Sequence, residues 1–428
     1  MTHPSLNTTP SQTATEEIAP SLARAPGERV HALDALRASA LLLGVVFHST
    51  LAYVMLPGDW GVGTAEPSLP LWWLVHYSHN FRMQVFFMLA GFFAALTIDK
   101  RGVVPYLRDR TMRIGLVFIL LLYPIKILIG LPWVQGGLKT GWLQLPPEAE
   151  GARLLDLVIG GIRLESWPFI TPAHLWFLYY LALIIILFVA ARAVTLTLLG
   201  DRAAAWQNRV ARGFYWLFSG WLAPLWLALL LTPWLASTPR FTLESPDKGF
   251  AIEWPALFIY GLFFCFGWWL RRRPELLTIF PRRWALFIPL SMLVSSFAFY
   301  LELQRYVTEA APQMMWVASF ANGLTTSLAV LGWTGFFLAV FSRESPLMRY
   351  LADSSYWVYI IHLPVVVAFQ VWVSNWDSLV AKLLFINSAT FVVTIASYHW
   401  LVRYTWVGQW LNGRRWVRPV YVQEEQQP

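Results

Sequence analysis

Asp34, Arg37 and His48 interrupt an otherwise apolar stretch between Val30 and Tyr53. Asp34 and Arg37 stand near its start, and His48 follows 11 residues after Arg37. At about 100° per residue, this interval brings Arg37 and His48 onto one helix face, roughly 16 Å apart along the axis. A histidine can be neutral near pH 7 and can transfer a proton. His48 therefore fits either proton-transfer chemistry or a structural hydrogen bond to a neighbouring helix.

A second cluster of polar side chains, which includes His79, Arg82 and Gln84, lies in the apolar segment between His76 and Gly91. Polar groups without partners are costly in lipid, so these side chains must face the interior of a helix bundle. Anchoring at the membrane surface explains the histidines at the start of this segment. It does not explain Arg82 and Gln84, which lie about one turn further in. We predict that His79, Arg82 and Gln84 line a cavity.

A pair of arginines, Arg110 and Arg113, stands at the start of the next apolar segment. Residues at i and i+3 are neighbours on one helix face. Two guanidinium groups side by side form a fork that suits a phosphate group. The alternative is ordinary basic charge at the inner membrane surface, or a site for anionic lipid.

Two further segments carry histidines among aromatic and hydroxyl side chains. His174 and Trp176 open an apolar segment directly after a proline, where they fit either an interfacial aromatic belt or the lining of an outer site. Ser355, Tyr359 and His362 are spaced i, i+4 and i+7, which makes a polar stripe on one helix face. His362 fits a structural hydrogen bond as well as it fits a substrate-lining position.

The composition is that of a membrane protein. Of the 428 residues, 57% are hydrophobic and 13% are charged, whereas soluble domains have about 25% charged residues. The net charge of +8 fits basic inner loops, so we predict no nucleic-acid partner. The single cysteine, Cys265, excludes a disulfide framework. Because no pair of the eight histidines shares a helix face with a carboxylate in a ligand-like spacing, we predict no metal site.

Apolar segments of about the length of a spanning helix recur along the chain and predict an all-α, polytopic bundle of about ten transmembrane helices. Of the 32 Lys and Arg residues, 23 fall in the loops and tails on one side and 6 in the loops on the other, which predicts that both termini are cytoplasmic. The longest outer loop contains an amphipathic stretch at 152–165 that suits the membrane interface. The predicted segments are 36–56, 73–98, 113–132, 174–198, 214–236, 251–270, 284–302, 314–341, 355–374 and 379–402.

The ends of the chain differ from the rest. Residues 1–29 are rich in Thr, Ser, Pro and Ala and have no long apolar core, so they predict a disordered cytoplasmic tail. We assign 30–412 to one transmembrane domain and 413–428 to a cytoplasmic tail.

With these stretches in order, the chain resembles the membrane-bound acyltransferase family 3 from about residue 31 to 412. Ala90 stands where the family usually has a serine, so that serine is not needed for chemistry here. Within the family the chain is most similar to members that succinylate periplasmic glucans, above all at 65–69 and 79–87. The matching motifs are Leu33-Asp34-Ala35-Leu36-Arg37 with His48, Phe86-Phe87-Met88-Leu89-Ala90-Gly91-Phe92, Arg110 with Arg113, His174-Leu175-Trp176-Phe177-Leu178, and Tyr356, Tyr359 and His362.

The resemblance implies transfer of an acyl group from a cytoplasmic acyl-CoA, succinyl-CoA or acetyl-CoA, to an extracytoplasmic sugar. The acyl-CoA is a co-substrate, and no permanently bound cofactor is implied. His48 would be the general base on the acceptor hydroxyl, with an acyl-imidazole intermediate as a variant. Asp34 and Arg37 would order the donor or the helix start, and Arg110 and Arg113 would meet the donor phosphates.

The acceptor side and the cavity lining would come from His79, Arg82, Gln84, His174, Trp176, Tyr359 and His362. The implied partners are membrane lipids, a glycan acceptor and proteins of glucan synthesis, and the implied location is the bacterial inner membrane. Two other functions remain open. One is O-acetylation of another envelope polysaccharide, and the other is a glycan or lipid permease, which buried histidines and arginines also suit. Dependence on coenzyme A separates the permease from both enzymes.

Overall fold

The computed structural model describes residues 31–240, 242–305, 312–413 and 416. This part of the chain is all-helical and contains no β-strand. The predicted tail 1–29 and nearly all of 413–428 lie outside the described residues. The helices are α1 His31–Leu51, α2 Leu69–Arg101, α3 Val103–Arg110, α4 Leu116–Thr140, α5 Leu154–Leu164, α6 Trp176–Leu199, α7 Ala203–Ser219, α8 Ala223–Ala236, α9 Trp254–Arg272, α10 Leu276–Ile279, α11 Trp284–Gln304, α12 Pro312–Val340, α13 Pro346–Trp372, α14 Leu379–Ser397 and α15 Trp406–Asn412.

Eight helical stretches of the described chain are long and apolar enough to cross a membrane. This confirms an all-α polytopic membrane protein, while the count of ten stays a prediction. The difference lies in α8, which has only 14 residues, and in α9, which has 19 and ends in two arginines. Each of the ten predicted segments overlaps a helix of the structure.

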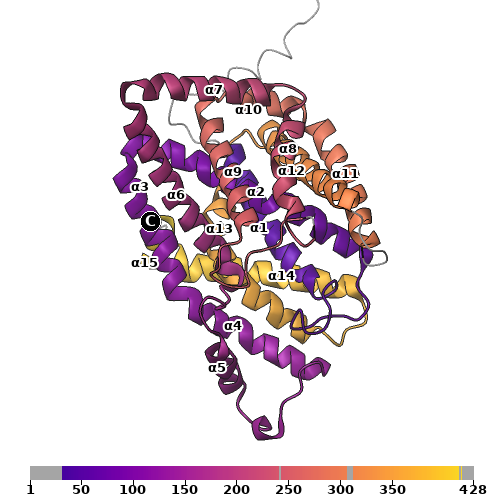
Figure 1. Cartoon of the computed structure of the whole chain (residues 1–428). Helices are drawn as coiled ribbons and strands as arrows, with labels where there is room; N and C mark the ends of the chain where they lie inside the picture. Colours follow the sequence, from indigo (N-terminus) through magenta and orange to yellow (C-terminus); the bar gives the residue numbers. More distant parts are fainter. Residues whose placement is uncertain (1–30, 241, 306–311, 414–415, 417–428) are drawn as a thin grey trace, which may run out of the picture.

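The predicted span 214–236 is wrong as a single helix. The chain breaks between α7 and α8, where Gly220 is extended and Pro224 occupies the first turn of α8. The helix α7 is amphipathic and buries Ala211, Phe214 and Phe218 on one face. It lies across the upper end of the bundle while α8 descends from it (Figure 1). The apolar residues near 214 therefore belong to a helix separate from α8.

The helix α4 continues to Thr140, eight residues beyond the predicted segment 113–132. The amphipathic stretch at 152–165 forms α5 as predicted and packs beside α4 at the lower end of the molecule (Figure 1). Lys126 of α4 pairs with Glu165 and donates a hydrogen bond to Thr171 at 3.1 Å. These bonds fix the α5 segment against the bundle and satisfy a lysine that faces inward.

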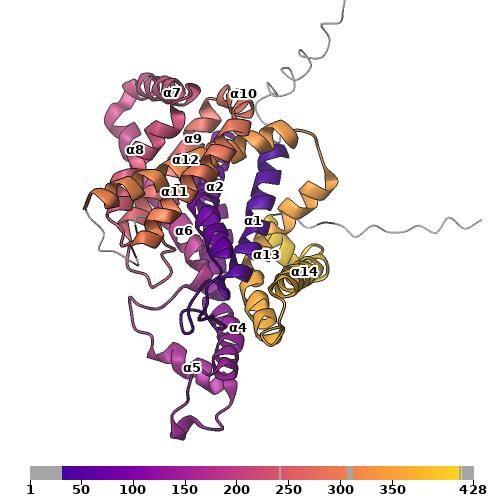
Figure 2. The same cartoon turned by 90° about the vertical axis from the view of Figure 1, so that its right-hand side faces the viewer.

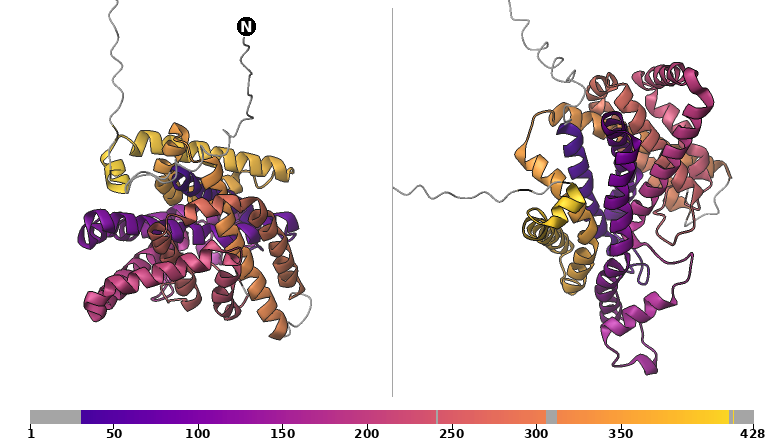
Figure 3. Two further views of the ribbon diagram at one scale, coloured as in Figure 1. Left: turned by 90° about the horizontal axis from the view of Figure 1, so that it is seen from above. Right: turned by 90° about the vertical axis from the view of Figure 1, so that its left-hand side faces the viewer.

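The centre of the molecule is formed by α1, α2, α9 and α13. Figures 2 and 3 show α1 and α2 running side by side, with α13 packed on the other side of α1. The approach of α2 to α9 is a backbone contact through Gly91 and Gly267. A Cβ atom on Gly91 would lie 1.9 Å from the Phe264 carbonyl oxygen, and one on Gly267 would lie 1.8 Å from that of Met88. Glycine is required at both positions because only its missing side chain allows this approach.

Candidate active site

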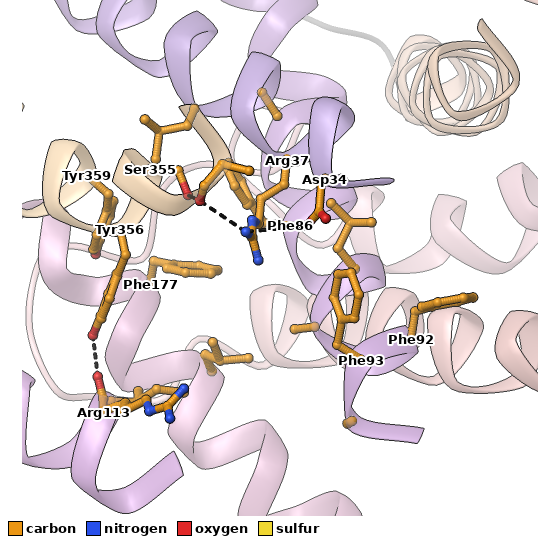
Figure 4. Close-up of a pocket in the computed structure, with 18 of the residues that line it drawn as sticks. Asp34, Arg37, Phe86, Phe92, Phe93, Arg113, Phe177, Ser355, Tyr356 and Tyr359 are labelled. Atoms are coloured by element: carbon orange, nitrogen blue, oxygen red, sulfur yellow. Dashed lines mark hydrogen bonds and ion pairs between the residues drawn. The ribbon is translucent and has the colours of Figure 1, made fainter. Parts of the chain in front are cut away.

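A cavity of about 880 Å³ opens between α1, α2, α3, α6 and α13. Ten of the twelve predicted site residues line it, although they come from segments far apart in the sequence. They are Asp34, Arg37, His48, Arg82, Arg110, Arg113, His174, Trp176, Tyr359 and His362. The phenyl rings of Phe86, Phe93 and Phe177 form an apolar wall between the charged groups (Figure 4).

Three histidines from three helical segments meet in this cavity. The ring centroid of His362 lies 5.2 Å from that of His48 and 5.4 Å from that of His174. A backbone carbonyl can only accept a hydrogen bond, so the contacts to carbonyl oxygens fix which ring nitrogen carries the proton. His362 donates from Nδ1 to Tyr359 O at 2.8 Å and to Val358 O at 3.1 Å, which leaves its Nε2 unprotonated in the neutral ring.

His174 has the opposite tautomer. Its Nε2 donates to the carbonyl oxygens of Tyr359 and Ile360, each at 3.1 Å, while its Nδ1 has no hydrogen-bond partner in the described part of the chain. The Tyr359 hydroxyl returns a hydrogen bond to the His174 carbonyl oxygen at 2.8 Å. These reciprocal bonds lock the start of α6 to the middle of α13, and they fix the orientation of the His174 ring.

His48 is positioned by two residues that the sequence does not single out, Trp60 and Gln370. The Trp60 ring stacks on the imidazole with 6.2 Å between centroids and 16° between planes. The buried Gln370 amide donates to the backbone carbonyls of His48 and Ser49 at 3.0 and 3.1 Å, and accepts from Trp60 Nε1 at 2.8 Å. One side chain therefore fixes both the backbone of His48 and the ring that covers it.

Arg82 is a buried cation that faces the same cavity, with 5% of its surface exposed. Its guanidinium lies 4.1 Å from the centroid of the Phe47 ring, a cation–π contact. Within the described ranges it forms no ion pair, and its Nη1 has no hydrogen-bond partner. Burying an arginine near a bilayer centre raises the free energy by about 2.5–3.5 kcal/mol. A desolvated cation–π contact lowers it by about 2 kcal/mol. Its protein neighbours therefore balance only part of the cost of this charge.

Arg37 connects the start of α1 to α13. Its Nη2 donates to the Ala352 carbonyl oxygen at 3.0 Å and lies 3.5 Å from the Asp34 carboxylate (Figure 4). Both Asp34 and Arg37 line the cavity, on the helix that also carries His48. The shared face predicted for Arg37 and His48 is thus the face that the structure turns toward the cavity.

The mouth of the cavity on the predicted cytoplasmic side is basic. Arg110 and Arg113 both bind Asp109, at 3.0 and 2.7 Å, so one carboxylate holds the two guanidinium groups in place. Arg101 and Arg271 line the same region. The sequence shows these last two only as ordinary inner-surface charge, because nothing in their spacing relates them to the arginine pair.

Aromatic contacts attach this mouth to α13. Tyr356 donates a hydrogen bond to the carbonyl oxygen of Arg113, and its ring is parallel to that of Tyr359, 6.4 Å away (Figure 4). Ser355, Tyr359 and His362, which form the predicted polar stripe, all line the cavity.

Comparison with known proteins identifies the family. Residues 30–400 match the family model described as an acyltransferase domain. The chain belongs to this acyltransferase family. The acyltransferase is 27% identical over 382 residues to Glucans biosynthesis protein C of Escherichia coli O139:H28 (strain E24377A / ETEC), and equally to that of Escherichia coli (strain SMS-3-5 / SECEC). Each match covers 84% of the acyltransferase and 89% of the relative. No solved structure gives a significant match.

Two of the predicted site residues of the acyltransferase, His79 and Gln84, are not among the residues that line the cavity. The His79 ring stacks on the Phe47 ring, with 5.5 Å between ring centroids. Gln84 is buried, with 2% of its surface exposed, and its Oε1 has no hydrogen-bond partner in the described chain. Gln84 points away because two steps along the helix turn it by about 200° from Arg82. His79 is three residues before Arg82, on the same side of α2, and contacts the same Phe47 ring.

Proposed function

We propose that the protein transfers an acyl group from a cytoplasmic acyl-CoA, with succinyl as the first candidate, to a hydroxyl group of a periplasmic glucan or another envelope glycan. It would act in the bacterial inner membrane. The glucan acceptor is proposed because the relatives are named for glucan biosynthesis. The succinyl donor is proposed from the resemblance at 79–87, a stretch that includes Arg82.

The observation that supports this proposal is the extent of the single cavity. One end is lined by residues from predicted cytoplasmic segments, among them Arg101, Arg110 and Arg271. At another point the cavity reaches Ser245, in a loop predicted to be periplasmic. The three histidines lie on this same cavity. A donor and an acceptor approaching from opposite sides of the membrane would therefore meet at the histidines.

The basic mouth suits the donor. Coenzyme A carries several phosphate groups, and a cluster of arginines binds phosphate by charge and by bidentate hydrogen bonds. Because Asp109 neutralises part of the charge of Arg110 and Arg113, Arg101 and Arg271 add to the positive field at the mouth. The apolar wall of Phe86, Phe93 and Phe177 suits the less polar arm of acyl-CoA, which carries the thioester.

The transfer would proceed at His48. A ring nitrogen of His48 takes the proton from the acceptor hydroxyl as the oxygen attacks the thioester carbonyl carbon. The carbon–sulfur bond then breaks, the thiolate leaves as coenzyme A and takes up a proton, and the new ester remains on the glycan. The stacked Trp60 ring and the Gln370 hydrogen bonds hold His48 in place, and such pre-positioning favours the reaction. The route through an acyl-imidazole on His48 uses the same residues.

The test is transfer from radiolabelled succinyl-CoA and acetyl-CoA in membranes that contain the wild type, His48→Ala or His399→Ala. His399 lies outside the cavity, where its Nδ1 is 3.3 Å from the Tyr350 hydroxyl, so its variant is the matched control. We expect label on periplasmic glucan with the wild type and the control, and none with folded His48→Ala.

Other outcomes separate the alternatives. Transfer of acetyl to another polysaccharide keeps the chemistry and changes the substrate. Unchanged transfer by His48→Ala would refute His48 as the base. No transfer from either donor by folded wild type would favour the permease.

A further inference from the structure

Arg82 is a charged residue of the cavity whose role the transfer step leaves unexplained. It lies on α2, lines the cavity and is buried with 5% of its surface exposed. Its guanidinium lies over the Phe47 ring, it forms no ion pair with the described residues, and its Nη1 has no hydrogen-bond partner among them. A guanidinium in such a position is suited to bind an anion carried by a ligand.

The position of Arg82 restricts where the anion lies. A Cβ atom on Gly44 would be 3.6 Å from Arg82 Nη1, so the guanidinium lies against α1 at Gly44. Gly44 and His48 are at i and i+4, one turn of the same helix and about 6 Å apart along its axis. Both residues line the cavity. A ligand with a reactive carbonyl at His48 would thus reach Arg82 with a short chain.

We propose that Arg82 binds the free carboxylate of a dicarboxylic acyl group and so selects donors such as succinyl-CoA over neutral acyl-CoAs. This inference rests on the proposed function, to which it adds the residue that determines acyl specificity. In an extended succinyl group three C–C bonds of about 1.5 Å each separate the carbonyl carbon from the carboxylate carbon. That length is comparable with the one-turn rise from His48 to Gly44, against which Arg82 lies. The carboxylate supplies the ion-pair partner that Arg82 lacks among the described residues.

Two other anions fit the same guanidinium. One is a negative group on the acceptor, and the other is the oxyanion that forms at the thioester carbonyl during transfer. Both are present whichever acyl group is transferred. Only a carboxylate on the acyl group makes the effect of Arg82 depend on the donor, so donor selectivity distinguishes it from the other two anions.

The experiment compares succinyl-CoA with its neutral methyl ester, each at the same acceptor concentration, for the full-length wild type and for Arg82→Gln. We expect the wild type to prefer succinyl-CoA by about 100-fold in kcat/KM, the size of a lost charged hydrogen bond in a buried site. In Arg82→Gln the preference should fall below about tenfold, because the charged donor loses an ion-pair partner and the neutral ester loses none.

The matched control is Arg283→Gln. Arg283 is also a buried arginine, with 8% of its surface exposed, and it lies over the Trp221 ring at 4.8 Å. It does not line the cavity, and its Nη1 donates to the Gly220 carbonyl oxygen at 2.6 Å. Its loss should leave the ratio of the two donors unchanged, whatever it does to the amount of folded enzyme.

An equal fall for both donors in Arg82→Gln would overturn the proposal and indicate the oxyanion or the acceptor. Equal use of both donors by the wild type would overturn it without any variant, and would leave acyl transfer itself intact. If Arg82→Gln gives no folded protein, Arg82→Lys replaces it and should retain part of the preference. No transfer from any acyl-CoA by folded wild type would instead refute the proposed function.

Discussion

The contact between α2 and α9 gives a sharp prediction for Gly91→Ala. The new Cβ would lie 1.9 Å from the Phe264 carbonyl oxygen, whereas ordinary van der Waals contact begins at about 3.4 Å. The two helices must therefore separate locally by about 1.5 Å. The atom in the way is a backbone oxygen, which cannot move aside by changing a side-chain rotamer. We expect a cost at the upper end of the usual overpacking range, about 3 kcal/mol.

The separation also affects the site, because Arg82 lies nine residues before Gly91 on α2. A shift of about 1 Å in a positioning element can reduce activity about 100-fold. The assay is the midpoint of unfolding in detergent, followed by intrinsic tryptophan fluorescence, together with acyl transfer. Gly261→Ala is the matched control on α9, because its Cβ would meet no atom within 4 Å. Equal midpoints for the two variants would refute the backbone contact.

Two further predictions concern His48 and the cavity mouth. Gln370→Leu removes the bonds that hold the His48 backbone and its stacked indole, so kcat should fall about tenfold with KM for acyl-CoA nearly unchanged, as measured by steady-state kinetics. The double variant Arg110→Gln, Arg113→Gln should raise KM for acyl-CoA and weaken its dependence on salt, measured between low and high ionic strength.

Each of these predictions has a contradicting result. A rise in KM alone for Gln370→Leu would mean that Gln370 acts on binding and does not position the histidine. An unchanged KM and salt dependence for the double arginine variant would place the donor phosphates elsewhere. Arg153→Gln is the control for salt effects, since Arg153 is exposed and pairs only locally, with Asp156 at 2.8 Å.

The sequence predicts the contents of the cavity well where residues share one helix. The face common to Arg37 and His48, and the stripe of Ser355, Tyr359 and His362, follow from helical periodicity alone. Periodicity does not show which helix faces which. Gln370 reaches the carbonyl of His48 across 322 positions of sequence, so no local pattern relates them.

The local sequence pattern also gives a wrong prediction where an apolar composition suggests one helix and the packing requires two. The run near 214–236 is apolar enough to suggest one crossing, yet α7 ends at Ser219 because Gly220 breaks the helix. Arg101 and Arg271 have the positions of ordinary inner charge, and their place at the cavity mouth depends on how the ends of α2 and α9 pack. Gln84 shares α2 with Arg82 but lies about 200° around the helix from it, so the density of polar residues predicts more cavity-lining side chains than the structure has.

The most direct measurement uses sealed inverted membrane vesicles with glucan enclosed in the lumen and labelled succinyl-CoA added outside. If one cavity brings a cytoplasmic donor to His48 and a periplasmic acceptor to the same point, label will appear on the enclosed glucan with wild type and not with folded His48→Ala. Label that appears only when donor and glucan are on the same side of the membrane would contradict transfer through this cavity.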